Sequence, residues 1–366
     1  MPAPTPVLLM VRELNSGGSE RQMAEIAKAL DRSRFDPRVG CFRPAGLRGD
    51  ELRAAGVPIA QFPVPSMISV KGALRMGSYI REQGIRLVHA FDTPANIYGV
   101  PASRMAGCPV VVSSQRVHRS LWPPIQRHAL RLTDRMVNAI VVNCEFMRRH
   151  MQDEEKAPAE LIQLCYNGID TEIFRVERRV RPEVLRDASL VVGVVCGLRP
   201  EKGLETLLDA FAAMRGLQAG LKLCIVGSGV CLQALQERAR DLGILRDTVF
   251  EPATSRVPDW LHAIDIFVLP SHSEALSNAL MEAMACGCAV AASRVGGNPE
   301  LVEPGETGML FEPRDAAGLA QVLGLMVQDP VLRCRLAHNA AQLIHSGFSL
   351  AAAARRMGEI YSALLA

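Results

Sequence analysis

The chain has 366 residues, of which 49% are hydrophobic and 22% are charged. This length predicts two domains, and the composition is that of a folded globular protein, which excludes wholesale disorder, collagen and coiled coil. A net charge of +3 and only 5% aromatic residues argue against a nucleic-acid partner, because such partners need a basic surface and rings for base stacking. The ten cysteines show no zinc-type spacing, so we expect buried thiols.

Membrane-spanning and secreted proteins are also disfavoured. Apolar runs such as residues 190–196 are far shorter than a membrane-spanning helix. The first residues lack the charged and apolar regions of a secretory signal. We therefore expect a cytoplasmic protein.

Short apolar runs alternate with segments of helical periodicity along the whole chain, which predicts an α/β protein with parallel sheets covered by helices on both faces. Two groups of strands imply two sheets. The expected strands are Val7–Val11, Pro37–Phe42, Leu87–Ala90, Val110–Ser113 and Ala139–Val142 in the first half, and Leu190–Cys196, Lys222–Val226, Thr248–Phe250, Ile266–Leu269 and Ala289–Ala292 in the second.

A linker separates the two groups of strands. Turn residues at 167–170 precede a charged stretch, 175–186, which contains Pro182 and little apolar periodicity. We therefore place the domain boundary within residues 170–188. The last segment, 348–366, has a helical apolar stripe, so it predicts a helix that could cap either domain.

The first strand leads into a pair of glycines, Gly17 and Gly18. Ser19 and Gln22 follow with the spacing of a capping box, so a helix should begin here. Backbone without Cβ atoms, just before a helix N-terminus, can approach an anion closely. The alternative is a turn that needs glycine for purely structural reasons. The dinucleotide-binding fingerprint GxGxxG is absent from this turn, which disfavours a dehydrogenase.

The second half opens in a similar way. Strand Leu190–Cys196 is followed by Arg199 and Lys202, which lie between Gly197 and Gly203. Two cations at the carboxyl end of a parallel strand are placed to bind phosphate, although loop cations are often simply solvated.

The segment after strand Ile266–Leu269 carries two glutamates eight residues apart, Glu274 and Glu282. Ser277 or Asn278 can cap the helix between them. One carboxylate would accept sugar hydroxyls and the other a ribose pair, while amides at the helix start would meet phosphate oxygens. Taken alone, each glutamate could equally be a solvated residue on a helix.

These motifs together resemble those of retaining glycosyltransferases of family 4, and the resemblance covers nearly the whole chain. It implies the GT-B fold: two facing Rossmann-like domains with parallel sheets, and a C-terminal helix that crosses back to the first domain. Residues 1–170 and 348–366 would form an acceptor-binding domain, and residues 171–347 a nucleotide-sugar-binding domain.

The resemblance also implies roles for individual residues. The donor diphosphate would be held by Gly17, Gly18, Arg199 and Lys202, the transferred sugar by Glu274, and the ribose by Glu282. Backbone amides of Ala275, Leu276 and Ser277 would assist at the sugar and phosphates.

Two residues are assigned to the acceptor or sugar side. His89 matches a histidine of the family, although a core or turn histidine is equally compatible with its position. Arg116 lies in the region where many family members carry a second histidine, and is a substitute for it. The catalytic set implied by the resemblance is Glu274, Arg199 and Lys202.

The activity so implied is transfer of a sugar, with retention of configuration, from a nucleotide sugar such as a UDP-sugar to a glycan or lipid-linked acceptor. A bacterial surface polysaccharide or glycolipid is the expected product. Cations stabilise the leaving diphosphate in this mechanism, and no Asp-x-Asp pair is present, so we expect no metal and no cofactor. The alternatives are a GT-B epimerase or phosphorylase and a noncatalytic sugar-nucleotide-binding protein.

A basic segment in the first half predicts docking on an anionic membrane surface, at the inner face of the membrane. Ile125, Ala129, Leu132 and Met136 have helical spacing beside a stripe of arginines. The alternative is a helix whose apolar face packs on the sheet and whose arginines are solvated. The arginines of the segment are Arg116, Arg119, Arg127, Arg131, Arg135, Arg148 and Arg149.

Overall fold

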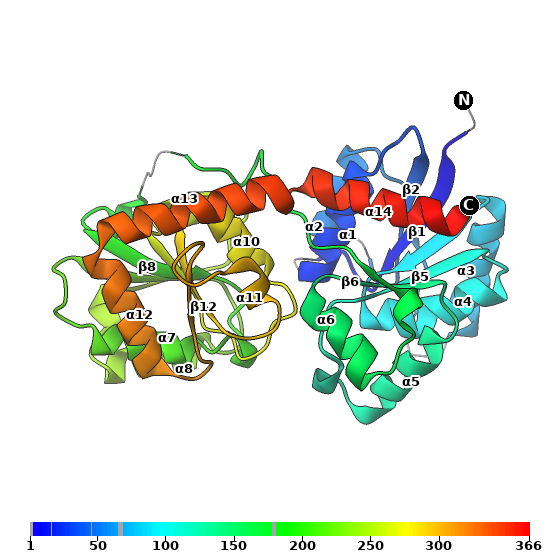
Figure 1. The fold of residues 1–366 in the computed structure, drawn as a ribbon. Coiled ribbons are helices and arrows are strands. Elements are labelled where there is room, and N and C mark those ends of the chain that lie inside the picture. The colour runs from blue at the N-terminus through cyan, green and yellow to red at the C-terminus, as the bar shows by residue number, and fades with distance from the viewer. Residues whose placement is uncertain (1–2, 16, 45, 65–68, 178–180) are drawn as a thin grey trace. The chain divides into compact units, whose positions relative to one another are not determined.

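The structure is a computed structural model that describes residues 3–15, 17–44, 46–64, 69–177 and 181–366. The chain forms two compact units (Figure 1). The first comprises Met1–Gly168 and Leu350–Ala366, and the second comprises Ile169–Ser349. These limits lie within two residues of the boundaries that the sequence suggests.

The first unit contains a seven-stranded parallel sheet in the order β3-β2-β1-β4-β5-β6-β7. The order reverses between β1 and β4, as in Rossmann-like sheets, whose ligands bind beyond the carboxyl ends of the strands at this point. The strands are β1 (Thr5–Val11), β2 (Phe35–Cys41), β3 (Ile59–Gln61), β4 (Leu87–Ala90), β5 (Val110–Gln115), β6 (Ala139–Val142) and β7 (Ile162–Leu164).

Helices surround this sheet, and the C-terminal helix is one of them. Ala353, Met357, Ile360 and Tyr361 of the last helix join the same hydrophobic cluster as the first helix and the sheet. The helices are α1 (Gly18–Ala29), α2 (Leu47–Ala54), α3 (Val70–Glu82), α4 (Val100–Met105), α5 (Pro124–Asp134), α6 (Glu145–Arg149) and α14 (Leu350–Leu365), with the shorter turns η1 (Ala95–Gly99), η2 (Arg119–Leu121), η3 (His150–Glu154) and η4 (Ala159–Leu161).

The second unit contains a six-stranded parallel sheet in the order β10-β9-β8-β11-β12-β13. Here the order reverses between β8 and β11, so the loops after these two strands share one edge of the sheet. The strands are β8 (Leu190–Val195), β9 (Leu221–Val226), β10 (Thr248–Glu251), β11 (Ile266–Leu269), β12 (Ala289–Ser293) and β13 (Met309–Phe311).

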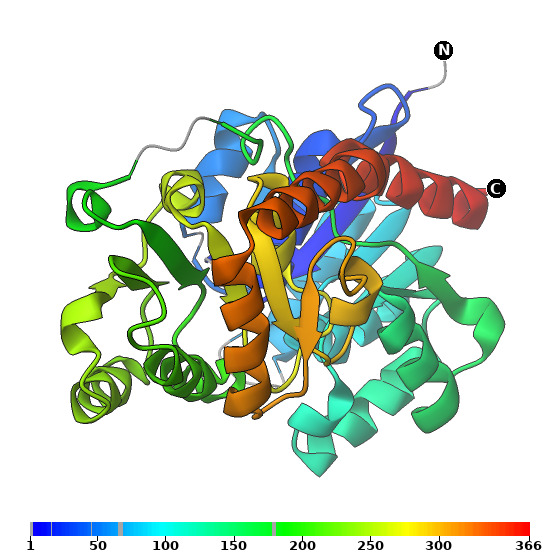
Figure 2. The same ribbon diagram turned by 60° about the vertical axis from the view of Figure 1, so that its left-hand side comes forward.

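Two long helices cover one side of this second unit, and Figure 2 shows them in orange and orange-red in front of the strands. One packs on α7 and β13, the other on α10 and β12. They are α12 (Ala316–Gln328) and α13 (Pro330–Gly347), and the others are α7 (Leu204–Ala213), α8 (Leu232–Asp241), α9 (Val257–Ala263), α10 (Asn278–Ala285) and α11 (Asn298–Leu301), with η5 (Glu183–Leu185), η6 (Pro200–Lys202) and η7 (Leu245–Asp247).

The ten strands expected from the sequence are all present. Three further strands, β3, β7 and β13, have three residues each and lie at sheet edges. Across the described residues, we find no helix with both the length and the apolar character needed to cross a bilayer.

Candidate functional site

The loops after β8 and β11 meet at the point where the strand order of the second sheet reverses. The backbone N–H of His272, after β11, donates to the carbonyl of Glu201, after β8, at 2.8 Å. The ammonium of Lys202 lies 2.5 Å from Oε1 of Glu274. Two motifs that are 72 residues apart in the sequence are therefore in direct contact.

The loop after β8 presents its two cations differently. Lys202 ends the short turn η6, and its side chain is only 13% exposed. Arg199 is 60% exposed and its Nε lies 2.8 Å from the carboxylate of Glu201. Gly203 then adopts a left-handed conformation with φ of +60° and starts α7, so the loop turns back within one residue of Lys202.

Glu274 is held by its own loop as well as by Lys202. The hydroxyl of Ser271 donates to Oε1 of Glu274 at 2.7 Å, and Ser293 in turn donates to the carbonyl of Ser271 at 2.6 Å. Oε2 of Glu274 accepts no hydrogen bond from any described residue. One carboxylate oxygen is thus fixed, and the other is available to a ligand hydroxyl.

The helix after this loop begins as the sequence indicates. Ser277 is its N-cap, and its Oγ accepts the N–H of Leu280 at 3.3 Å. Glu282 lies in the second turn and is 5% exposed, so it is a buried carboxylate and not a solvated one. The carbonyl of Ala275 accepts the N–H of Gly297 at 2.6 Å, and Leu276 is buried beside it.

Two glycine loops, which follow β9 and β12 of the second sheet, support this site. A Cβ atom at Gly296 (φ +55°) would lie 1.8 Å from the carbonyl oxygen of Glu274, and one at Gly227 would lie 1.9 Å from that of Cys196. Only glycine permits such approaches. The sequence contains a Gly-Gly pair at 296–297, but only the fold shows which backbone it contacts.

The N-terminal glycine pair has a different local structure from the one expected. Helix α1 begins at Gly18 with Gly17 as its N-cap, and no side chain caps it. The Ser19 capping box is therefore wrong. Gln22 instead exchanges two hydrogen bonds with the backbone of Gly168, at 2.9 and 3.0 Å. The carboxylate of Glu20 lies so close to Gly17 that a Cβ there would be 2.0 Å from it.

His89 lies in the core of the first unit. It is fully buried in β4, its Nδ1 is 2.7 Å from the hydroxyl of Tyr361, and its Nε2 is 2.8 Å from the hydroxyl of Ser114. Burial, and secondarily Arg116, holds its pKa well below the usual 6.5. His89 is therefore a core histidine, which was one of the two interpretations compatible with the sequence. Both of its ring nitrogens have a hydrogen-bond partner.

Arg116 follows β5 and is half-buried. Its guanidinium lies 5.1 Å from the centre of the Phe91 ring and donates to Oδ1 of Asn167 at 2.6 Å. Burial lowers its pKa. No carboxylate among the described residues pairs with it, so this cation remains able to bind an anion at the carboxyl edge of the first sheet.

A missed residue lies at the reversal point of the first sheet. Asp92, just after β4, accepts the N–H of Arg12 at 2.7 Å and that of Ala95 at 2.8 Å. Burial raises the pKa of Asp92 to about 6. It joins the loop after β1 to the loop after β4. In the sequence, its only distinguishing feature is that it lies three residues after His89.

One group of side chains in the described part of the chain has a spacing compatible with a metal: His118, His150 and Glu154. The histidine nitrogens that face Glu154 lie 3.6 and 3.2 Å from its carboxylate. The other nitrogens accept the backbone N–H of Ser120 and of Arg119. Nδ1 of His150 has no hydrogen-bond partner in the described part of the chain, and 3.6 Å at His118 is too long for a hydrogen bond, so the three side chains form a loose polar cluster.

The arginine-rich segment is more extensively paired than expected. Arg119 is fully buried between Asp134 and Glu155, at 2.7 and 3.3 Å. Arg131 lies 2.7 Å and Arg127 3.9 Å from the same Glu155. Of the arginines that recur every four residues along this segment, Arg127, Arg131 and Arg135, the first two therefore pair with a buried carboxylate.

The structure also differs from the alternative in which the apolar face of α5 packs on the sheet. Ile125 is 77% exposed and Leu132 is 47% exposed, whereas Leu130 fills the core. Leu121, just before the helix, is 56% exposed. These three exposed side chains, Leu121, Ile125 and Leu132, are called the α5 apolar surface below.

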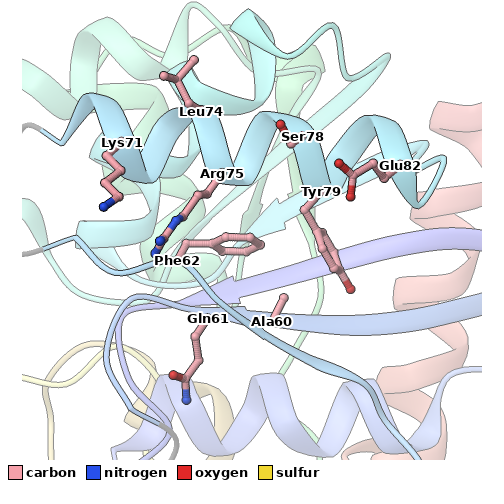
Figure 3. Close-up of a pocket in the computed structure, with 9 residues that line it drawn as sticks. All are labelled: Ala60, Gln61, Phe62, Lys71, Leu74, Arg75, Ser78, Tyr79 and Glu82. Atoms are coloured by element: carbon pink, nitrogen blue, oxygen red, sulfur yellow. The ribbon is translucent and has the colours of Figure 1, made fainter.

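A hollow of about 530 Å³ lies between the end of β3 and helix α3 (Figure 3). Lys71 and Arg75 are one helical turn apart, and Arg75 extends toward Phe62 in this view; neither has an ionic partner among the described residues. No residue expected from the sequence lies here. The lining residues are Ala60, Gln61, Phe62, Lys71, Leu74, Arg75, Ser78, Tyr79 and Glu82.

Two Rossmann-like sheets, with a cation and a carboxylate joined at the reversal point of the second, are the features expected of a GT-B glycosyltransferase. The family described as Glycosyltransferase Family 4 matches residues 16–173, and Glycosyl transferases group 1 matches residues 177–343. The chain belongs to this family of glycosyltransferases. The comparisons give no support to the epimerase alternative.

Relatives match most of the chain. A GDP-mannose-dependent α-(1-6)-phosphatidylinositol monomannoside mannosyltransferase of Mycolicibacterium smegmatis is 30% identical over 77% of this chain and 78% of its own. An Escherichia coli UDP-Gal:α-D-GlcNAc-diphosphoundecaprenol α-1,3-galactosyltransferase is 24% identical over 94% and 93%.

Solved structures share the fold. Anabaena Alr3699/HepE in complex with UDP and glucose has a TM-score of 0.86 with 22% identity, and covers 97% of this chain and 99% of its own. Sucrose-phosphate synthase from Thermosynechococcus elongatus has a TM-score of 0.84 with 18% identity, over 98% and 99%. These matches establish the GT-B architecture of the chain.

Proposed function

We propose that the protein transfers a hexosyl group from a nucleoside-diphosphate sugar to a glycan or lipid-linked acceptor, with retention of anomeric configuration. The observation that carries the proposal is the contact between Lys202 and Glu274 at the reversal point of the second sheet. A cation suited to a diphosphate and a carboxylate suited to sugar hydroxyls are adjacent there, as a nucleotide sugar requires.

The donor would be bound mainly by the second unit. Lys202 and the more exposed Arg199 would bind the diphosphate, Oε2 of Glu274 would accept a hydroxyl of the sugar, and Glu282 would accept the ribose. Backbone amides of residues 275–277, at the start of α10, favour an anion. Gly17 and Gly18 remain in the proposal because of the family resemblance, although Glu20 brings a carboxylate close to Gly17.

The two cations account for the chemistry proposed. Negative charge grows on the diphosphate as its bond to the sugar breaks, and fixed positive charges in a partly dry site stabilise it. Loss of one such group typically costs about 3 kcal/mol in the barrier. Because Arg199 and Lys202 supply this charge, we propose that transfer needs no divalent metal and no cofactor.

The acceptor would lie on the first unit. Arg116 is an unneutralised cation at the carboxyl edge of that sheet, which suits the phosphate of a lipid-linked acceptor. His89 is fully buried, so it would act only by holding its neighbours. The named relatives act on a phosphatidylinositol mannoside and a diphosphoundecaprenol-linked sugar, which supports a lipid-linked acceptor here.

We further propose that the α5 apolar surface docks on an anionic membrane at its inner, cytoplasmic face. The surface has three exposed apolar side chains, and Arg135, at the end of α5, has no ion pair among the described residues. Such a mixture suits the interface between lipid headgroups and acyl chains. Docking would bring the first unit to a membrane-bound acceptor.

The activity is tested by incubating the protein with UDP-, GDP- and ADP-sugars. Binding at 100 times the Kd should add about 2.7 kcal/mol to the free energy of unfolding, so a thermal shift identifies the donor. Transfer to lipid extracts or glycans is then followed with the labelled donor, with and without EDTA, and NMR of the product gives the anomeric configuration. Inversion, or strict dependence on a divalent ion, would contradict the proposal.

A further inference from the structure

His272 belongs to the loop that carries Glu274 and contacts the loop that carries Lys202. It has no role in the proposed function above. Its backbone N–H donates to the carbonyl of Glu201 at 2.8 Å. Its ring Nε2 lies 2.9 Å from Oε1 of Glu205, in the first turn of α7. The residue therefore contacts the loop after β8 on both sides of Lys202.

The ring of His272 lies against the backbone of Gly203. A Cβ atom at Gly203 would be 2.6 Å from Cε1 of His272 and 2.3 Å from the carbonyl oxygen of Pro270. This glycine thus permits the two loops to pack backbone against ring. The side chain of His272 is 17% exposed, so little water reaches the contact.

One polar contact fixes the orientation of this ring. Nδ1 of His272 is buried and has no hydrogen-bond partner in the described part of the chain. Nε2 is therefore the donor, and the carboxylate of Glu205, which is 48% exposed, is its acceptor. Removing either partner leaves the ring held by packing alone.

Glu274 follows His272 by two residues and Lys202 precedes Gly203 directly. The distance between the ammonium and the carboxylate consequently depends on how the two loops are joined. In the proposed site a free nucleoside diphosphate would meet the cations Lys202 and Arg199, whereas a nucleotide sugar would meet Glu274 as well. Spacing between these loops thus matters for the sugar nucleotide more than for the nucleoside diphosphate.

We propose that His272 and Glu205 form a positioning pair that sets the spacing of Lys202 and Glu274, and so makes the site prefer a nucleotide sugar over the corresponding nucleoside diphosphate. This inference rests on the proposed function, because it assigns the donor to these two loops. His272 is a positioning residue and need not touch the donor.

The test uses the full chain and four variants. His272→Leu keeps bulk and removes the donor, His272→Gln keeps an N–H donor on a side chain of similar length, and Glu205→Gln removes the charged acceptor. Asp209→Asn is the matched control. Asp209 lies on the same helix as Glu205, and this variant loses an ion pair with Arg238, which does not belong to either loop. The ligands are whichever pair the wild type binds among UDP and UDP-glucose, GDP and GDP-mannose, and ADP and ADP-glucose.

Calorimetry gives the ratio of the two dissociation constants for each variant. The preference for the sugar nucleotide should fall about tenfold in His272→Leu and in Glu205→Gln, which corresponds to about 1.4 kcal/mol. Their double variant should be no worse than either alone, because both changes break one contact. His272→Gln should recover part of the preference, and Asp209→Asn should keep all of it.

Two other outcomes would distinguish a failure of the positioning pair from a failure of the proposed function. If Lys202→Ala and Glu274→Ala impair donor binding but the ratio is unchanged in His272→Leu and Glu205→Gln, the positioning pair is refuted even if the melting temperature falls. If Lys202→Ala and Glu274→Ala themselves leave donor binding intact, the donor site is wrong, and with it the proposed function.

Discussion

The ammonium of Lys202 lies 2.5 Å from Oε1 of Glu274, so the cation proposed for the diphosphate and the carboxylate proposed for the sugar form an ion pair with one another. Both side chains are nearly buried, at 13% and 11% exposure. A nucleotide sugar would therefore meet both charges at one place, with its diphosphate beside Lys202 and a sugar hydroxyl at Oε2 of Glu274. Each charge would keep a partner when the donor binds.

Replacing Lys202 by alanine should destabilise the protein as well as impair transfer, because it leaves the Glu274 carboxylate with Ser271 as its only described donor. We expect a loss of about 1–3 kcal/mol in the free energy of unfolding. Arg199→Ala is the control, since Arg199 is 60% exposed and its surface pair contributes little. Urea unfolding of both variants checks this, and equal stability would contradict it. The double variant Lys202→Ala with Glu274→Ala should recover part of the loss.

The two glutamates should separate in kinetics. Glu274→Gln should mainly lower kcat, by about 100-fold or more, because its interaction with the reacting sugar strengthens in the transition state. Glu282→Gln should mainly raise the KM for the donor, since contact with the ribose is the same before and during the reaction. Steady-state kinetics with a labelled donor measures both. Wild-type constants in both folded variants would exclude the assignment.

Stability should depend on pH through His89. Its pKa in the folded protein lies well below 6.5, so folding favours the neutral ring, and the stability this provides is present above about pH 6.5 and lost as pH falls. The free energy of unfolding should therefore fall between pH 6.5 and 5, because the unfolded chain binds a proton at this ring that the folded protein does not. Urea titrations at both pH values should show a smaller drop in His89→Asn. An identical drop would mean that His89 is not responsible.

Membrane docking should depend on the α5 apolar surface. Ile125→Ser with Leu132→Ser should weaken cosedimentation with anionic liposomes at least tenfold. Burial of each of these side chains in the membrane would contribute about 1.5–3 kcal/mol to the binding free energy. Leu325→Ser with Val331→Ser is the matched control, as these residues are 57% and 77% exposed in the second unit. Arg135→Glu should reduce only the part of binding that salt weakens. Equal binding by the two double variants would remove the membrane proposal.

Long apolar runs made the sheets predictable, and short or distant features did not. The five strands expected in each half all form, because buried parallel strands are continuous apolar runs. Edge strands such as β3 and β7 have three residues each, too few for a periodic signal. The sequence predicted the Lys202–Glu274 contact only in outline. Each motif follows the end of a strand, and the structure shows that these two strands are neighbours.

Local rules failed where a distant partner competed. Gln22 has the spacing of a capping box, but the backbone of Gly168, 146 residues away, takes its side chain. Likewise, the periodicity of α5 showed which residues share a face, yet it could not reveal that Glu155 would pair with Arg127 and Arg131. Such pairings depend on tertiary structure and leave no mark within one segment.

The hydrogen bond between Tyr361 and His89 joins the last helix to the core of the first unit. The two residues are 272 positions apart, so the first unit lacks part of its own core until residue 361 has been synthesised. The second unit, residues 169–349, is continuous and can complete its core earlier. Domains usually fold from the N-terminus onward during synthesis, and here the order of completion is reversed: the unit that the ribosome starts first is the one that finishes last.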